Sequence, residues 1–303
     1  MSENFRIIFG YILICLLWGS TWLAIRLGLD SLTPILSAGL RFLLASGFIF
    51  ILMKITKRKI QTDKVSIKLY LILGVFSFVI PFALVYWAEQ FISSALTSIL
   101  FGLFPFFVIF FSKLLMPNEK IGLYQTVAVI LGFVGTLIIF GNELSLDISN
   151  DLWGMLAVIG SAFLQGWIAV IIKKSGKHLD PISMNLVPIL LAGIVMTLSG
   201  YFFEDMTKVV FTSKAIGSII YLALFGTLFT FTIYYWLMQR INVVILSLST
   251  FITPIIAIIL GYLVLNEKLS FLTLIGGGIV LSGIVVANMQ GLIKYYKVKF
   301  GIK

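Results

Sequence analysis

The feature that most constrains this sequence is a series of apolar runs, each long enough to cross a membrane as a helix. A helix needs about 20 mostly apolar residues to cross about 30 Å of hydrocarbon. Ten such runs follow one another, with short charged segments between them. They cover residues 7–25, 34–53, 68–88, 92–112, 121–140, 152–172, 182–203, 214–236, 242–264 and 271–290. The chain is therefore predicted to be an all-α integral membrane protein with ten transmembrane helices.

Composition excludes several other classes. Hydrophobic residues make up 60% of the chain and charged residues 11%, whereas a soluble domain carries about 25% charged residues. A soluble fold of this length needs more polar side chains to cover its surface. We therefore exclude a soluble enzyme, a nucleic-acid-binding domain and a disordered chain, and we expect the lipid bilayer as a partner and no nucleic acid.

The chain also lacks the residue patterns of metal and nucleotide chemistry. Cys15 is the single cysteine and His178 the single histidine, and the sequence has no HExxH, Cys/His or Gly-rich phosphate-loop pattern. We expect no metal, no cofactor and no catalytic residues. The protein is predicted not to be an enzyme and not to be an ATP-driven pump by itself.

The basic residues predict the orientation of the chain in the membrane. If the N-terminus is cytoplasmic, 17 of the 22 Lys and Arg residues lie in cytoplasmic segments, which are favoured for basic residues. These are Arg6, Lys54, Lys57, Arg58, Lys59, Lys64, Lys68, Lys113, Lys120, Lys173, Lys174, Lys177, Arg240, Lys294, Lys297, Lys299 and Lys303. We predict a multi-pass protein of the cytoplasmic membrane with both termini in the cytoplasm.

An internal repeat divides the chain. The segment Tyr86–Lys120 recurs as Tyr235–Lys268, and Gly19 and Pro34 recur as Gly166 and Pro181. The identical pairs in the longer segment are Tyr86/Tyr235, Trp87/Trp236, Gln90/Gln239, Ile92/Ile241, Ser98/Ser247, Pro105/Pro254, Ile109/Ile258, Leu114/Leu263, Asn118/Asn266, Glu119/Glu267 and Lys120/Lys268. Residues 1–145 and 146–303 are predicted to form two halves of five spans each.

The odd number of spans in each half reverses the second half relative to the first. Inverted repeats are the architecture from which many secondary transporters build alternating access, with the substrate near the midplane between the halves. The sequence therefore predicts a secondary transporter.

The order of these marks resembles a known family. The segment WGSTWLAIRLGLDSLTPILSAGLRF (Trp18–Phe42) and the two copies that end in NEK resemble the EamA-type transporters of the drug/metabolite transporter superfamily. The resemblance covers nearly the whole chain and implies ten spans in two five-span repeats. It also implies a central cavity lined mainly by spans 1, 3, 4, 6, 8 and 9, and export of amino acids or other small metabolites.

The chain departs from some relatives within that superfamily. Small four-span members carry a proton- and drug-binding Glu in the first span, but Ile7–Ile25 contains no carboxylate, so their proton exchange is not carried over. Sugar-phosphate relatives use several buried basic residues. Here Arg41 is the one clear basic residue well inside a span, which disfavours a phosphorylated substrate.

The first candidates for the cavity lining are aromatic residues in or at the ends of spans. They are Trp18, Trp22, Tyr86, Trp87, Trp167, Tyr235 and Trp236. The two Tyr-Trp pairs end spans, where aromatic residues also serve as anchors at the membrane surface. Trp18 and Trp167 lie deeper, beside the matched glycines, and either line the cavity or pack between helices. An aromatic cavity favours apolar, aromatic or cationic ligands.

The other candidates are polar residues and prolines. Burying Arg41 at membrane depth costs free energy, and three interpretations stay open: it reaches toward the outer surface or pairs with backbone carbonyls, it binds a substrate carboxylate, or it forms a structural ion pair, for example with Glu89. Gln165 and Gln239 orient a polar substrate group or hydrogen-bond between helices. Pro105 and Pro254 each remove a helix hydrogen bond and either act as hinges or only kink their helices.

The sequence thus favours an exporter of small organic metabolites, such as aromatic or amphipathic amino acids, that works by alternating access. The alternatives are a non-transporting membrane scaffold or an integral membrane enzyme; a channel is disfavoured because no charged ring or filter motif is present. Proton or ion coupling, the direction of transport and the oligomeric state are left open.

Overall fold

The computed structural model describes residues 3–88, 92, 97, 100–118, 121–140, 148–253, 255–256, 259 and 271–300. Side chains are described for these residues except 22, 23, 26, 140, 148–151, 273, 288 and 290–300. All elements in the described part of the chain are helices.

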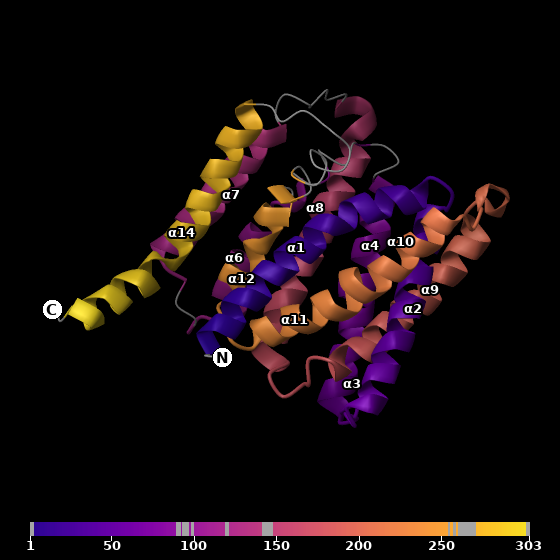
Figure 1. Cartoon of the computed structure of the whole chain (residues 1–303), viewed down its shortest axis with the longest axis horizontal. Helices are drawn as coiled ribbons and strands as arrows, with labels where there is room; N and C mark the ends of the chain where they lie inside the picture. Colours follow the sequence, from indigo (N-terminus) through magenta and orange to yellow (C-terminus); the bar gives the residue numbers. More distant parts are fainter. Residues whose placement is uncertain are drawn as a thin grey trace.

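Figure 1 shows how the described helices are arranged. In chain order they are α1 (Glu3–Leu29), α2 (Pro34–Ile55), α3 (Lys64–Leu73), the π-helical η1 (Gly74–Val79), α4 (Ile80–Ala88), α6 (Phe104–Leu115), α7 (Leu123–Phe140), α8 (Ile148–Ser175), α9 (Ser183–Phe203), the short 3₁₀ helix η3 (Met206–Lys208), α10 (Ser213–Ala223), the π-helical η4 (Leu224–Phe229), α11 (Thr230–Met238), α12 (Val243–Ser247) and α14 (Phe271–Phe300).

Six helical segments are long and apolar enough to cross a membrane. They are Glu3–Thr21, Pro34–Ile55, Lys64–Ala88, Leu152–Ser175, Ser183–Phe203 and Ser213–Met238, and they fall on six of the predicted spans. The other four predicted spans overlap shorter apolar helices, Phe104–Leu115, Leu123–Ile139, Val243–Thr253 and Leu274–Ala287. The chain is therefore an all-helical membrane protein, and the count of ten transmembrane helices stays a prediction.

The surface of the bundle is apolar, as expected for contact with lipid. Phe203 exposes 88% of its surface, and Leu123, Phe271 and Phe202 also expose most of theirs. A water-soluble protein rarely exposes so many large apolar side chains. In a lipid bilayer the same side chains contact hydrocarbon, which is also apolar.

Helices α2 and α9 pack closely with their directions reversed. A methyl group on Gly39 would clash with the backbone of Thr197, one on Gly193 with Leu43, and one on Gly200 with Leu36. Residue numbers rise on α2 as they fall on α9, so the two helices are antiparallel. Small residues let the backbones approach, which is the main source of helix association in a membrane.

Helices α7 and α14 form a second antiparallel pair, at one edge of the molecule (Figure 1). A methyl group on Gly135 would lie 2.6 Å from the Gly276 carbonyl oxygen, and one on Gly276 would lie 2.5 Å from the Gly135 carbonyl oxygen. Further along, Gly283 faces the Ala128 carbonyl. Alanine at these glycines would therefore force the two backbones apart.

The centre of the bundle is formed by α1 and α8 with their neighbours. Helix α1 packs along α10, η4 and α11, whereas α8 packs along α4 and α6. Gly19 lies against Ile256, and Gly166 lies against Phe107 and Val108. Both glycines are covered by a neighbouring helix, so their backbones approach protein and not an open cavity.

Two spans contain a π-helical segment in their middle. We call Lys64–Ala88 span 3 (α3, η1 and α4) and Ser213–Met238 span 8 (α10, η4 and α11). Segments η1 and η4 each have six residues. A π-helix changes which side chains face a given neighbour and is frequent at functional sites.

Carboxylates hold the starts of α2 and α9. Glu204 accepts hydrogen bonds from the backbone N–H groups of Ile35 (2.8 Å) and Leu36 (2.9 Å). Asp180 accepts from the N–H groups of Ile182 (3.2 Å) and Ser183 (3.0 Å). A negative charge at a helix start is stabilising, because these amides have no partner within the helix.

Candidate functional site

A cavity of about 190 Å³ lies in the centre of the bundle. Its lining comes from α1, α2, span 3, α6 and the residues before it, α8, α11, and the residues after α12. The lining residues are Trp18, Thr21, Ile25, Arg41, Leu73, Ser77, Pro81, Phe82, Val85, Tyr86, Thr97, Phe101, Phe104, Ser161, Gln165, Ile168, Ala169, Ile172, Phe231, Tyr234, Tyr235, Met238, Ser249, Thr250 and Thr253.

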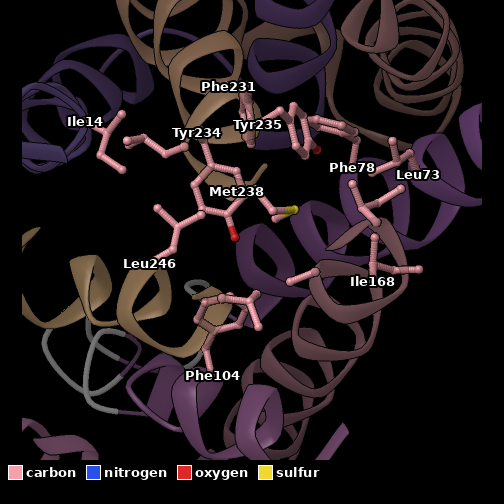
Figure 2. Packing of buried hydrophobic residues seen from close by; sticks show 14 of the residues in the cluster. Ile14, Leu73, Phe78, Phe104, Ile168, Phe231, Tyr234, Tyr235, Met238 and Leu246 are labelled. Atoms are coloured by element: carbon pink, nitrogen blue, oxygen red, sulfur yellow. The ribbon is translucent and has the colours of Figure 1, made fainter. Parts of the chain in front are cut away.

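Apolar side chains form most of the wall. Figure 2 shows part of it, where residues of α11 face α8 and span 3 across the same space. The labelled lining residues are Leu73, Phe104, Ile168, Phe231, Tyr234, Tyr235 and Met238. A cavity with this lining favours the apolar part of a ligand.

Trp18 joins α1 to the aromatic side of this wall. Its ring meets Phe231 edge-on, with centroids 5.7 Å apart, and lies 5.3 Å from the Tyr234 centroid at a tilted angle. Phe231 and Tyr234 are three residues apart on α11, so they share a face of that helix. Together the three rings form an aromatic part of the wall, against which an apolar or aromatic ligand group can pack.

Arg41 is the charged residue of the described lining. It is only 3% exposed. Its Nε donates to Thr227 Oγ1 (2.8 Å), and one of its terminal nitrogens donates to the Gly226 carbonyl oxygen (2.9 Å). The guanidinium also lies over the rings of Phe42 (5.3 Å) and Phe82 (5.7 Å). Arg41 therefore connects α2 to η4 across the centre of the protein.

The π-helical segments bring other polar groups to the cavity. In η1, the Ser77 hydroxyl donates to Gln165 Oε1 of α8 (3.1 Å). In η4, the Gly226 carbonyl accepts from Arg41, as the i→i+5 pattern leaves some carbonyls available for partners outside the helix. Each π-helical segment thus meets a polar side chain of a different helix beside the cavity.

Further hydroxyl groups come from α1, α8 and the residues after α12. The hydroxyls of Thr21, Ser249 and Thr250 donate to the carbonyls of Trp18 (2.6 Å), Leu246 (2.8 Å) and Ser247 (2.9 Å), each three residues earlier in the chain. A hydroxyl that donates in this way keeps an oxygen that can accept. These oxygens can receive an N–H or O–H group of a ligand.

The structure brings five of the predicted site residues to the cavity. They are Trp18, Arg41, Tyr86, Gln165 and Tyr235. Sequence reasoning missed Ser77, Phe82, Phe231 and Tyr234, because single Ser and aromatic residues are common in apolar spans. One signal was present: Phe231 and Tyr234 share the face of span 8 that continues to Met238.

Four other candidates have different surroundings. Trp87 is 41% exposed, Trp167 packs edge-on against Phe76 with centroids 5.7 Å apart, and Trp236 lies beneath the Arg240 guanidinium at 4.3 Å. Gln239 donates to the Leu179 carbonyl oxygen (2.8 Å). None of these four residues belongs to the described lining of the cavity.

Three predicted sites cannot be compared with the structure. The Trp22 side chain, Pro254 and Glu89 lie outside the described residues. Pro105 is described, and it lies in the first turn of α6, after a turn at Gly102 and Leu103. It begins a helix there and removes no bond from a helix interior, so the chain bends just before it.

Polar contacts join the helices at one end of the cavity. The Lys173 ammonium, at the end of α8, donates to the carbonyls of Met238 and Ile241, both at 2.7 Å. A small extension of 10 Å³ shares Met238 with the cavity and is also lined by Lys173 and Gln239. Arg58, after α2, forms an ion pair with Asp180, between α8 and α9. These contacts close the end of the bundle from which α3 begins.

Comparison with known sequences gives a family match over most of the chain. The EamA-like transporter family matches residues 5–141 and again residues 152–289. The uncharacterized transporter YoaV of Bacillus subtilis is 28% identical over 279 residues, covering 92% of this chain and 95% of that protein. Protein PagO of Salmonella typhimurium is 29% identical over 248 residues, covering 82% and 81%.

Two further comparisons agree with this match. The uncharacterized inner membrane transporter YedA of Escherichia coli is 24% identical over 279 residues, covering 90% of this chain and 88% of that protein. A solved crystal structure aligns with a TM-score of 0.83 at 17% identity, covering 95% of this chain and 98% of the solved one. At that identity the structural likeness is evidence for a shared fold alone.

Proposed function

The chain belongs to the EamA-like transporter family and is a multi-pass membrane transporter of a small molecule, and from this premise we propose that it exports amphipathic organic metabolites, amino acids included, by alternating access. The observation that carries the proposal is the central cavity between two halves that each match the family. Secondary transporters bind their substrates at such a position, between repeats.

The proposed architecture is ten spans in two inverted repeats, residues 1–145 and 146–303. Packing symmetry supports it: Gly19 lies against Ile256, and the matched Gly166 lies against Phe107, whose own repeat mate is Ile256. The antiparallel pairs α2/α9 and α7/α14 are what inverted halves require, since each pair joins equivalent helices. The π-helical segments at equivalent points of spans 3 and 8 agree with it.

The proposed transport cycle opens the two ends of the cavity in turn. Opening the end described above requires Lys173 to leave the carbonyls of Met238 and Ile241, and Gln239 to leave Leu179. The Arg58–Asp180 ion pair between the halves would also have to separate. The excess of basic residues in the connections supports a cytoplasmic position for this end and for both termini.

The proposed substrates follow from the size and lining of the cavity. Its volume of about 190 Å³ fits a small metabolite, its rings suit an apolar or aromatic group, and its polar side chains suit one hydrophilic end. The described lining contains no carboxylate that would carry a proton. Coupling to a proton or another ion is therefore a question for the flux measurement.

Flux in proteoliposomes tests the proposal. Purified protein is reconstituted, and uptake and efflux of a metabolite panel are measured with and without a pH gradient. We expect saturable flux of one or more amphipathic metabolites. Ala169→Phe, which fills part of the cavity, should abolish this flux, while Leu156→Phe on the lipid-exposed side of the same helix should keep it. Without saturable flux for any compound, a non-transporting scaffold becomes the better interpretation.

A further inference from the structure

The electrostatic character of the cavity is set by one residue. Among its described lining residues, Arg41 is the sole charged side chain, and the lining has no described Asp, Glu, Lys or His. The remaining polar groups are hydroxyls and the Gln165 amide, which are neutral. The described lining therefore carries a net charge of +1.

That charge is held by neutral partners. The two hydrogen bonds to η4 use two of the five N–H donors of the guanidinium, and Tyr86, another lining residue, is a further side-chain hydrogen-bond partner of Arg41. Among the described residues, no carboxylate lies within ion-pair distance of Arg41. A positive charge in a cavity with a mostly apolar lining attracts an anion more strongly than the same charge in water.

We propose that the cavity selects its ligand through a single carboxylate that binds Arg41, and that an ammonium group on the ligand is dispensable. The proposal deepens the transport function given above and rests on it. A guanidinium matches a carboxylate in geometry and forms short, charge-assisted hydrogen bonds with it. One arginine balances one negative charge, so a monoanion fits better than a dianion.

The other polar residues of the lining explain why the ammonium is dispensable. The hydroxyl oxygens of Thr21, Ser249 and Thr250 can accept an N–H or an O–H group equally. No described lining residue offers a carboxylate to a cation. An ammonium group thus loses its hydration in the cavity without gaining an ionic partner, whereas a hydroxyl in its place loses much less.

Three ligands that share a benzyl group separate the two charges. Phenylalanine carries both, 3-phenyllactate carries the carboxylate with a hydroxyl, and phenethylamine carries the ammonium alone. Binding to the purified full-length protein is measured by calorimetry in detergent micelles. We expect 3-phenyllactate to bind at least as tightly as phenylalanine, and phenethylamine at least about tenfold more weakly. Equal or tighter binding of phenethylamine would overturn the proposal.

Variants of Arg41 distinguish ligand binding from support of η4. In Arg41→Gln, the preference for 3-phenyllactate over phenethylamine should disappear, while Arg41→Lys should keep it because the charge stays. The ratio of two affinities in one variant does not depend on the folded fraction. The exposed Lys54→Gln on the same helix is the control for lost charge and should keep the preference. If Arg41→Gln weakens all three ligands equally, Arg41 only positions η4 and the proposal is wrong.

Binding and flux measured together distinguish a failure of this inference from a failure of the transport proposal. Saturable flux of other compounds by a protein that binds none of the three ligands would overturn the carboxylate inference alone. No saturable flux of any compound would instead overturn the proposed function. Carboxylate-dependent binding together with saturable flux of 3-phenyllactate would support both.

Discussion

Spans 3 and 8 have the same irregular backbone and different surroundings. Each consists of an α-helix, a six-residue π-helical segment and a second α-helix, and each ends in a Tyr-Trp pair. In span 3, Gly74 at the start of η1 lies against Pro188 and Leu191 of α9. In span 8, η4 is held by Arg41 of α2. The repeat aligns Arg41 with Pro188 at the offset of 147 that relates Gly19 to Gly166.

This difference separates a feature of the repeated fold, the π-helical segment, from a feature that concerns ligand binding, the charge of Arg41. Both halves carry the π-helical segment, so it belongs to the packing of the repeated unit beside the cavity. The charge occurs once, on one side, where its partners are the carbonyl and hydroxyl oxygens of η4. We infer that the backbone irregularity belongs to the packing of both halves, while Arg41 gives the cavity its polarity.

The largest expected effect is on transport after loss of the charge. Arg41→Gln removes charge-assisted hydrogen bonds worth about 1.5–3 kcal/mol, so flux should fall by at least about tenfold. Pro188→Ala changes the equivalent position of the other half, where contacts are apolar, and flux should stay within about threefold of wild type. The measurement is flux in proteoliposomes at matched protein levels.

Two outcomes would contradict this asymmetry. Equal losses in Arg41→Gln and Pro188→Ala would mean that both positions act only through packing against the π-helical segments. Unchanged flux in Arg41→Gln would remove the charge from the mechanism altogether. A normal elution profile for each variant on size exclusion is the control for folding.

The sequence predicted much of the fold because an apolar run of sufficient length is enough to predict a membrane-spanning helix. All ten predicted runs overlap apolar helices, and the cost of burying a cation drew attention to Arg41. Which side of a helix faces the cavity was harder to predict. Tyr86 is 5% exposed and lines the cavity, whereas its neighbour Trp87 is 41% exposed. In an apolar span both faces are hydrophobic, so periodicity does not distinguish them.

The π-helical segments add to this difficulty. A π-helical turn rotates the residues that follow it relative to an ideal α-helix. A helical wheel with about 3.6 residues per turn along the whole of span 3 or span 8 therefore assigns residues after the π-helical segment to the wrong face. Gln239 shows a related limit. It was a candidate because it is an uncharged polar residue at the end of a span, for substrate binding or for a hydrogen bond between helices, and it donates to a carbonyl in the α8–α9 connection. The residue type indicated a polar contact without indicating which partner the side chain has.

The second prediction compares the hydrogen bonds of the two segments. Thr227→Val removes the acceptor of the buried Arg41 Nε, and leaving a charged donor unpaired should lower the free energy of unfolding by about 1.5–3 kcal/mol. Ser77→Ala removes a neutral bond to Gln165, and such bonds in membranes average about 0.6 kcal/mol. Denaturant titration in mild detergent measures both. A larger loss for Ser77→Ala would reverse the comparison.

The third prediction concerns a methyl group added to each segment. In Gly226→Ala the new methyl would lie 2.8 Å from Thr21 Cγ2 and 3.4 Å from an Arg41 nitrogen. Because Thr21 has a branched, stiff side chain, we expect a net loss of about 1 kcal/mol. In Gly74→Ala the closest atom, at 2.7 Å, is the Cδ2 tip of Leu191, which can move. The free-energy cost of moving Leu191 should be offset, because alanine is about 1 kcal/mol more favourable than glycine in a helix.

The same titration measures the two glycine variants, and their difference is more informative than either value. If Gly74→Ala destabilises the protein more than Gly226→Ala, then the contact of η1 with α9 is tighter than the contact of η4 with α1 and α2. That result would contradict our view that η4 is the more constrained segment.

The smallest expected effect is at the starts of the two spans, which differ in their capping residue. Asp63 caps α3 by accepting from the N–H groups of Val65 (3.1 Å) and Ser66 (3.0 Å). The hydrogen bonds that Asp63 accepts from the Ser66 side chain and backbone, together with nearby His178, lower the pKa of its carboxyl group. Thr212 caps α10 with a hydroxyl that accepts from the Ala215 N–H (3.2 Å) and does not titrate in this range.

The consequence is a pH dependence in one span only. Because the pKa of Asp63 is lowered on folding, its contribution is complete above the ordinary value of about 3.9 and is lost as the pH falls through the lower folded value. Hydrogen exchange of the Val65 and Ser66 amides, corrected for intrinsic rates, should therefore speed up only below about pH 4. The Ala215 amide in span 8 should keep its protection over the same range. Asp63→Asn, which still caps but does not titrate, should remove the difference, so a pH dependence that persists in this variant would assign it to another group.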